Sequence, residues 1–194
     1  MGRLNDSLTY LCGPIDNVPD DGVEWRRKVA VQLKERYGMK VLDPTDKPFK
    51  SHTVNYEEIG DEKQSSINLR AEGRFPELAE KFRAIVRADL RCVDLSDILI
   101  CYMPKGVKMC GTIHEIIVST NSKKPTLVVV EGGRREISHW FWGILPSEPH
   151  EEDRSGWIFD SWEALFDYLD EVDEAEEIPE PKASRWVLLD VGSR

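Results

Sequence analysis

Long hydrophobic runs are missing from this 194-residue sequence, and its first residues hold no apolar core of signal-peptide length. A membrane-spanning helix needs about 18 or more apolar residues in a row. A secretory leader needs a shorter apolar run that follows basic residues. We therefore expect a soluble, cytoplasmic protein that has no membrane partner.

Cysteine and histidine are scarce, and their spacing suits neither a disulfide framework nor a metal site. The four cysteines form no C-x-x-C pair and lie in or beside apolar segments, and the four histidines are scattered along the chain. We expect reduced and mostly buried thiols, no bound metal and no cofactor. The cysteines are Cys12, Cys92, Cys101 and Cys110.

The sequence is also poor in positive charge. It contains 26 lysines and arginines against 36 aspartates and glutamates, which gives a formal net charge of −10. Binding to DNA or RNA depends mainly on clustered basic side chains that neutralise the phosphate backbone. This charge balance argues against a polynucleotide partner, although it does not exclude a single small nucleotide.

Short apolar runs alternate with helical patterns along the first two thirds of the chain. This alternation is typical of a parallel sheet in an open α/β fold. We expect one flavodoxin-like domain, with a strand order of about 2-1-3-4-5 and helices on both faces of the sheet. The predicted strands are 8–14, 39–44, 97–104 and 125–133, and the predicted helices are 21–38, a stretch beginning at Pro76, and 111–124.

Other segments are less regular. Residues 45–73 show no clear period, and a loop of that length inside a domain is usually functional or mobile. Farther on, the sequence predicts a short aromatic helix around 135–144, a fifth strand at 156–161 and an amphipathic helix at 161–172. We assign the α/β domain to residues 1–172, and 173–194 to an acidic linker and a terminal segment that forms an edge strand or a subunit contact.

In open α/β sheets, ligands bind beyond the carboxyl ends of the strands, where the strand order reverses. Two turns should meet there: "GPID" (13–16), after the first strand, and "MPKGVKMCGT" (103–112), after the third. The helix that begins near Gly111 and Thr112 would direct its unpaired N–H groups into this crevice.

Glu115 allows two interpretations. Thr112-x-x-Glu115 matches a capping box, in which the two side chains satisfy amides at the start of a helix. Alternatively, Glu115 is an ionised carboxylate directed into the crevice. Asp89 lies on the apolar stripe of the preceding helix, where desolvation and a nearby anion would favour its protonated form; a partner for Arg87 or Arg91 is the structural alternative. An ionised and a protonated carboxylate together suit cleavage of a glycosidic bond.

The segments "TYLCGPID", "DLRCVDLSDILICY" and "GTIHEI" followed by "KKPTLVVV" resemble the nucleoside 2-deoxyribosyltransferases and the related deoxynucleoside monophosphate N-glycosidases, over about residues 8–130. The resemblance implies that Glu115 is the nucleophile, that Asp89 handles the proton of the departing base and that Tyr10 hydrogen-bonds Glu115. Core packing is the alternative for Tyr10. The substrate-binding residues would be Gly13, Pro14, Asp16, Asp97, Met109, Gly111 and Thr112.

Several of these positions have a structural alternative or depart from the family. Asp97 matches an Asp that opens the third strand in the family, but it also suits a strand-start cap. Gly13 would allow close approach to a ligand or simply form a turn. Met109 stands where the transferases have Asp and the hydrolases Ser. Lys105 and Lys108 could hold a 5′-phosphate, or be solvated.

The resemblance thus implies a glycosidic enzyme that acts on a 2′-deoxynucleoside or its 5′-monophosphate, with a free nucleobase as acceptor in a transferase and water in a hydrolase. It also implies a homo-oligomer with a shared active site. Residues 139–143, "HWFWG", could stack on the base, form a subunit contact or pack in the core. A sensor of the same fold that binds a nucleotide without reaction is the alternative from another class.

Overall fold

The computed structural model describes residues 2–48, 56–145 and 157–175. Five parallel strands form one sheet in the order β2-β1-β3-β4-β5, which confirms the predicted flavodoxin-like order. The strands are β1 (Leu8–Cys12), β2 (Lys40–Leu42), β3 (Ile98–Met103), β4 (Thr126–Val130) and β5 (Ile158–Phe159).

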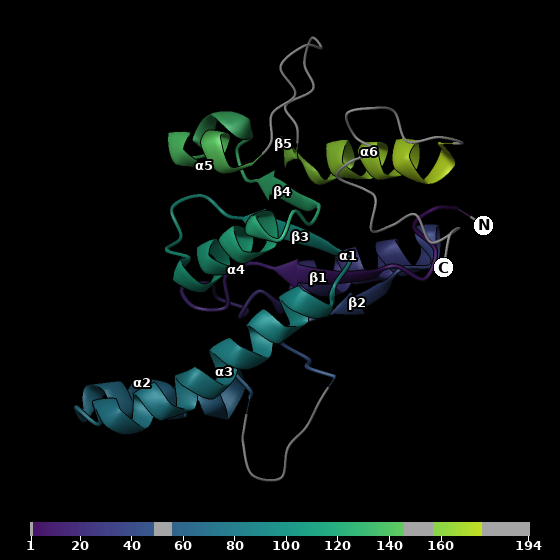
Figure 1. Cartoon of the computed structure of the whole chain (residues 1–194). Coiled ribbons are helices and arrows are strands. Elements are labelled where there is room, and N and C mark those ends of the chain that lie inside the picture. Colours follow the sequence, from purple (N-terminus) through teal and green to yellow (C-terminus); the bar gives the residue numbers. More distant parts are fainter. Residues whose placement is uncertain (1, 49–55, 146–156, 176–194) are drawn as a thin grey trace.

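Helices cover both faces of this sheet (Figure 1). They are α1 (Val23–Tyr37), α2 (Gly60–Ala71), α3 (Phe75–Leu95), α4 (Cys110–Asn121), α5 (His139–Ile144) and α6 (Trp162–Glu174), with one 3-10 turn, η1 (Arg134–Glu136). Helices α1 and α6 contribute to one hydrophobic core, whereas α3, α4 and α5 contribute to the other. The all-buried β4 and the almost entirely buried β3 explain why both read as continuous apolar runs.

Helix ends follow local signals in two clear cases. Gly38 ends α1 in a left-handed conformation (φ 68°), and its N–H bonds the carbonyls of Leu33 and Lys34. Ser161 begins α6, where its hydroxyl accepts a hydrogen bond from Ala164 N at 3.2 Å. Helix α6 ends at Glu174, two residues beyond the predicted boundary, and most of the proposed linker and terminal segment lies outside the described residues.

The region expected to be a long loop contains a helix, so that prediction is wrong. Helix α2 buries none of its residues, and therefore has no apolar stripe that a periodicity could reveal. It packs instead against α3, where Lys81 Nζ donates to Glu62 O at 2.8 Å and to Glu62 Oε2 at 2.6 Å. Figure 1 shows α2 and α3 as a pair that extends away from the sheet.

The described residues contain no helix that is both long and apolar enough to cross a bilayer. Within the same residues, no three histidine, cysteine, aspartate or glutamate side chains come together in a way that could hold a metal ion. All four cysteines are free thiols, and three of them are buried, as the sequence predicted; Cys110 is exposed.

Candidate active site

A cavity of about 380 Å³ lies at the carboxyl ends of β1 and β3, between α3 and the start of α4. Because β1 pairs with β2 on one side and β3 on the other, this is the predicted reversal point of the strand order. The lining residues include Tyr10, Gly13, Pro14, Ile15, Asp16, Asn17, Pro44, Glu58, Phe82, Ile85, Val86, Asp89, Leu90, Lys108, Met109, Gly111, Thr112, His114 and Glu115.

Glu115 is held by two side chains from β1. Tyr10 Oη donates to Glu115 Oε1 at 2.8 Å, and the Cys12 thiol donates to Glu115 Oε2 at 2.9 Å. Burial raises the pKa of Tyr10 and of Cys12 well above their usual values, so both stay protonated and both remain donors. The contact between Tyr10 and Glu115 is the one that the family resemblance implied.

The capping-box interpretation of Glu115 is wrong. Helix α4 begins at Cys110, two residues before Thr112, and the carbonyl of Met109 accepts the hydrogen bond from Ile113 N at 3.0 Å. Glu115 therefore lies in the second turn, beyond the amides that a capping carboxylate would reach. Its carboxylate faces β1 instead.

The expectation that Glu115 ionises readily at a helix start is also corrected. Burial raises the pKa of Glu115, whereas the hydrogen bonds from Cys12 and Tyr10 lower it, and the net direction is upward. The two donors thus oppose the cost of burying the charge. They are the part of the site that favours the carboxylate form.

Asp89 is buried on α3, and neither Arg87 nor Arg91 is its partner in the described contacts. Lys47 Nζ lies 3.0 Å from Asp89 Oδ1, in an ion pair with little exposure of either side chain. Burial, and then the charges of Glu58 and Glu115, raise the pKa of Asp89 to about 8, although Lys47 lowers it. The direction and its main cause are those predicted from the sequence.

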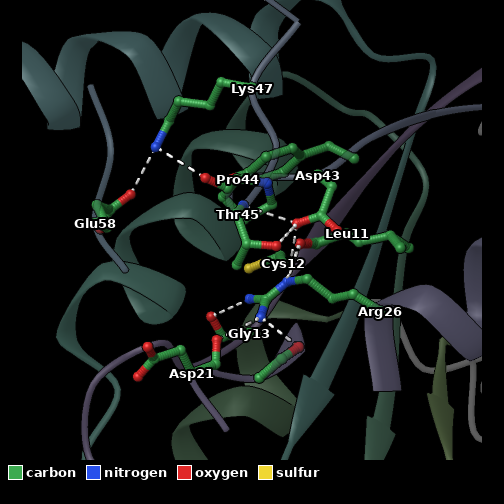
Figure 2. A network of polar contacts seen from close by, with 12 residues as sticks. Leu11, Cys12, Gly13, Asp21, Arg26, Asp43, Pro44, Thr45, Lys47 and Glu58 are labelled. Carbon is green, nitrogen blue, oxygen red and sulfur yellow. Dashed lines mark hydrogen bonds and ion pairs between the residues drawn. The ribbon is translucent and has the colours of Figure 1, made fainter. Parts of the chain in front are cut away.

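Arg26 shapes the turn that leaves β1 (Figure 2). Its fully buried guanidinium donates to Leu11 O at 3.2 Å, Gly13 O at 2.6 Å and Gly22 O at 2.9 Å, and it lies 3.8 Å from Asp43 Oδ1. This side chain connects the end of β1 to the start of α1, and so holds in place the turn that carries the lining residues 13–17.

The structure gives a reason for glycine at position 13 that the sequence did not predict. A Cβ there would lie 2.7 Å from the Trp25 ring and 3.2 Å from the carbonyl of Tyr102. Packing against Trp25 therefore excludes a side chain at this position, independently of any ligand. Gly13 still lines the cavity.

Most other predicted binding residues line the cavity, but two do not. Pro14, Asp16, Met109, Gly111, Thr112 and Lys108 all line it. Asp97 lies at the amino end of β3, where its carboxylate accepts a hydrogen bond from Leu8 N at 2.9 Å. Lys105 pairs with Glu136 at 3.0 Å, away from the cavity. Asp97 is thus a strand-start cap, and the phosphate role predicted for Lys105 finds no place in the structure.

The aromatic cluster at 139–143 does not reach the cavity either. Phe141 is buried in the core between the sheet and α3, α4 and α5, whereas Trp140 is 76% exposed. Base stacking by this cluster is therefore not what the structure shows, and core packing describes Phe141.

Sequence reasoning missed three residues that act on Glu115 or Asp89: Cys12, Lys47 and Glu58. Cys12 was interpreted only as a buried thiol. Lys47 and Glu58 belong to the segment without a period, and their proximity to Asp89 depends on the tertiary fold. The one available signal was the length of that segment, which exceeds ordinary connections.

Comparison with known proteins gives limited similarities. No protein-family model matches this sequence. Among curated proteins, cysteine protease 1 of Neurospora crassa is 26% identical over 113 residues, which cover 51% of this chain and 22% of that protein. The chain thus spans about a fifth of the length of the curated relative it matches.

The solved structures that are similar to this one include two enzymes. A 2-deoxyribosyltransferase from the psychrotolerant bacterium Bacillus psychrosaccharolyticus matches at 16% identity and a TM-score of 0.49, over 82% of this chain and 90% of that one. The CMP N-glycosidase BcmB of Clostridium botulinum matches at 13% identity and a TM-score of 0.44, over 84% of this chain and 98% of that one. Similarities this low leave the reaction to be argued from the residues of this chain.

Proposed function

We propose that this protein is an enzyme that cleaves the N-glycosidic bond of a 2′-deoxynucleoside or its 5′-monophosphate through Glu115 and transfers the sugar to another base. The single observation that carries the proposal is the pairing of a doubly held carboxylate, Glu115, with a second acid, Asp89, in one cavity. The motif resemblance over residues 8–130 supplies the substrate class.

In the first step, a Glu115 carboxylate oxygen attacks C1′ of the sugar. The bond from C1′ to the base nitrogen breaks, its electron pair stays with the base, and the proton of Asp89 neutralises the departing base. The product is an ester between the sugar and Glu115. Tyr10 and Cys12 support this step by fixing the orientation of the attacking carboxylate.

In the second step, a nitrogen of the incoming base attacks C1′, and the ester bond breaks to restore the Glu115 carboxylate. The proton released by the incoming base returns to Asp89. Because the pKa of Asp89 is about 8, this residue can give up and regain a proton near neutral pH. If water attacks instead of a base, the same residues carry out hydrolysis.

The charges around the cavity favour an uncharged nucleoside over its monophosphate. Of the described residues that line it, four are acidic (Asp16, Glu58, Asp89 and Glu115) and one, Lys108, is a lysine. A phosphate would be repelled by this balance, and only Lys108 and the amides at the start of α4 would oppose that repulsion. The apolar wall of α3, formed by Phe82, Ile85 and Leu90, offers a surface for the base.

The free thiols suit a reducing compartment such as the cytoplasm. A homo-oligomer in which neighbouring subunits complete the site is part of the same proposal, and it rests on the family resemblance alone.

The proposal is tested by incubating the purified protein with 2′-deoxynucleosides and with their 5′-monophosphates, with and without free adenine or cytosine, and separating the products by chromatography. A new nucleoside that forms only when a free base is added indicates transfer. Free base with sugar or sugar phosphate indicates hydrolysis.

Glu115→Ala should abolish either activity, and Glu136→Ala, which changes a carboxylate outside the cavity, is the matched control. If the wild-type protein neither releases nor exchanges a base while it still binds nucleosides, the enzymatic proposal is wrong and a sensor of the same fold takes its place.

A further inference from the structure

Lys47 stands at the centre of the polar contacts behind the cavity. Its Nζ donates to Pro44 O at 3.0 Å, to Tyr56 O at 2.9 Å and to Glu58 Oε1 at 2.7 Å, and Figure 2 shows its contacts with Pro44 and Glu58. Asp89 Oδ1 lies at 3.0 Å from the same nitrogen. One ammonium thus has four oxygen neighbours.

An ammonium group carries only three protons. The two carbonyls and Glu58 take all three of them as hydrogen bonds. Asp89 Oδ1 is left near the positive charge, but it accepts no hydrogen bond from the described residues although it is buried. A buried carboxylate oxygen in that state is costly, and protonation of the carboxyl group relieves the cost.

We propose that Glu58 is a positioning residue that keeps the proton on Asp89, because it occupies the last N–H of Lys47, and that Lys47 is a positioning residue that compensates the Asp89 carboxylate once the proton has gone to the departing base. This inference rests on the proposed function for the catalytic use of that proton. The titration of Asp89 is nevertheless measurable in the protein alone.

The charges around Asp89 agree with this role. Glu58 and Lys47 approach it from the segment between β2 and α2, Glu115 from α4 and Tyr10 from β1, while Cys92 lies one turn farther along α3. Two carboxylates, Glu58 and Asp89, therefore compete for one lysine. Burial and the charge of Glu58 are the two largest causes that raise the pKa of Asp89, and Lys47 is the main cause that lowers it.

The same arrangement prepares the site for the loss of that proton. When the base takes the proton of Asp89, the new carboxylate lies beside the Lys47 ammonium at ion-pair distance. The charge that develops is thus compensated by a group that is already in place and does not have to move. Two backbone carbonyls fix the position of Nζ whichever carboxylate is charged.

The test is a titration of the Asp89 side-chain carboxyl carbon by NMR with ¹³C-labelled aspartate, assigned with the Asp89→Asn variant. Glu58→Gln removes one negative charge and leaves a neutral amide oxygen, a weaker acceptor that leaves more of the Lys47 charge to Asp89. The Asp89 midpoint should then fall by about one pH unit or more. Lys47→Met removes the cation, and the midpoint should rise. Asp61→Asn, at an exposed position of α2, should leave it unchanged.

The alkaline limb of the kcat/KM profile for base release should move with the Asp89 midpoint in the Glu58→Gln variant. If the NMR midpoint shifts but the wild-type protein releases no base, the proposed function fails and the positioning role stands. If Glu58→Gln leaves the midpoint where it was, or moves it upward, the inference is overturned. If Lys47→Met does not fold, the Glu58→Gln titration alone decides.

Discussion

Replacing Tyr10 by phenylalanine removes one hydroxyl from the site and little else. Tyr10 is fully buried in β1, and its ring packs in the core between the sheet and α3, α4 and α5, so the phenylalanine ring fills the same space. The lost contact is the 2.8 Å hydrogen bond to Glu115 Oε1. Among the described side chains that donate to Glu115, Cys12 would remain.

The size of the effect follows from the charge on the acceptor. A hydrogen bond to a charged group contributes about 1.5–3 kcal/mol, and one pKa unit corresponds to about 1.36 kcal/mol. Because Tyr10 favours the carboxylate form, its loss should raise the pKa of Glu115 by about one to two units. The acidic limb of kcat/KM should move upward by the same amount, and the rate well below the new pKa should fall about 10- to 150-fold.

The assay is base release or exchange measured from pH 4.5 to 9.5. The loss of rate in Tyr10→Phe should diminish as the pH rises, until protons leave Asp89 near pH 8 and limit the recovery. Tyr37→Phe is a matched control, because it removes a buried hydroxyl that bonds Asp170 at 2.7 Å on the other face of the sheet. A uniform loss of rate at every pH, with an unmoved acidic limb, would refute this account of Tyr10.

Three further substitutions have clear expected outcomes. Asp89→Asn should raise the Tm at pH 8.5 but not at pH 4. The pKa of Asp89 in the folded protein is about 8, above the usual value near 3.9. The stability of the wild-type protein therefore falls as the pH rises between these two values, and the neutral amide avoids this loss. Each kcal/mol of stability that the substitution restores should raise the Tm by about 2–4 °C. An unchanged Tm at pH 8.5 would contradict this expectation. Arg26→Lys should lower the free energy of unfolding, measured in urea, by about 2 kcal/mol or more, because the carbonyls of Leu11, Gly13 and Gly22 lose guanidinium donors. A change near zero would mean that water replaces the guanidinium. Asp97→Ala should cost about 1 kcal/mol of stability and leave kcat/KM unchanged, and a selective loss of kcat/KM would return Asp97 to the substrate.

The sheet could be predicted from the sequence because its strands and helices differ in hydrophobic period. Buried strands such as β4 read as unbroken apolar runs, and α3 carries one apolar stripe along its length. Helix α2 gave no such signal, because it buries no residue and is stabilised by polar contacts with α3. Helix α2 depends on its contacts with α3, and a local sequence pattern carries no information about contacts between distant segments.

The site was predictable in its position and only partly in its chemistry. The reversal of strand order located the cavity, and the periodicity of α3 placed Asp89 on a buried face. The spacing of Thr112 and Glu115 was misleading, because the helix begins earlier than the capping motif suggested. Asp97 was misplaced because a strand has two ends, and only the carboxyl end faces the cavity.

The partners of Asp89 could not be predicted, because three protons and four acceptors meet at Lys47 only after folding. Lys47 and Glu58 are eleven residues apart in the sequence. No periodic pattern connects them to α3, so neither residue spacing nor helix propensity could show that they lie beside Asp89.

The two carbonyls held by Lys47 come from Pro44 and Tyr56, on opposite sides of residues 49–55. The lysine therefore connects the backbone at Pro44 to the backbone at Tyr56. Loss of the Lys47 ammonium should thus release Pro44 and Tyr56 together, and with them the hold on the Glu58 carboxylate.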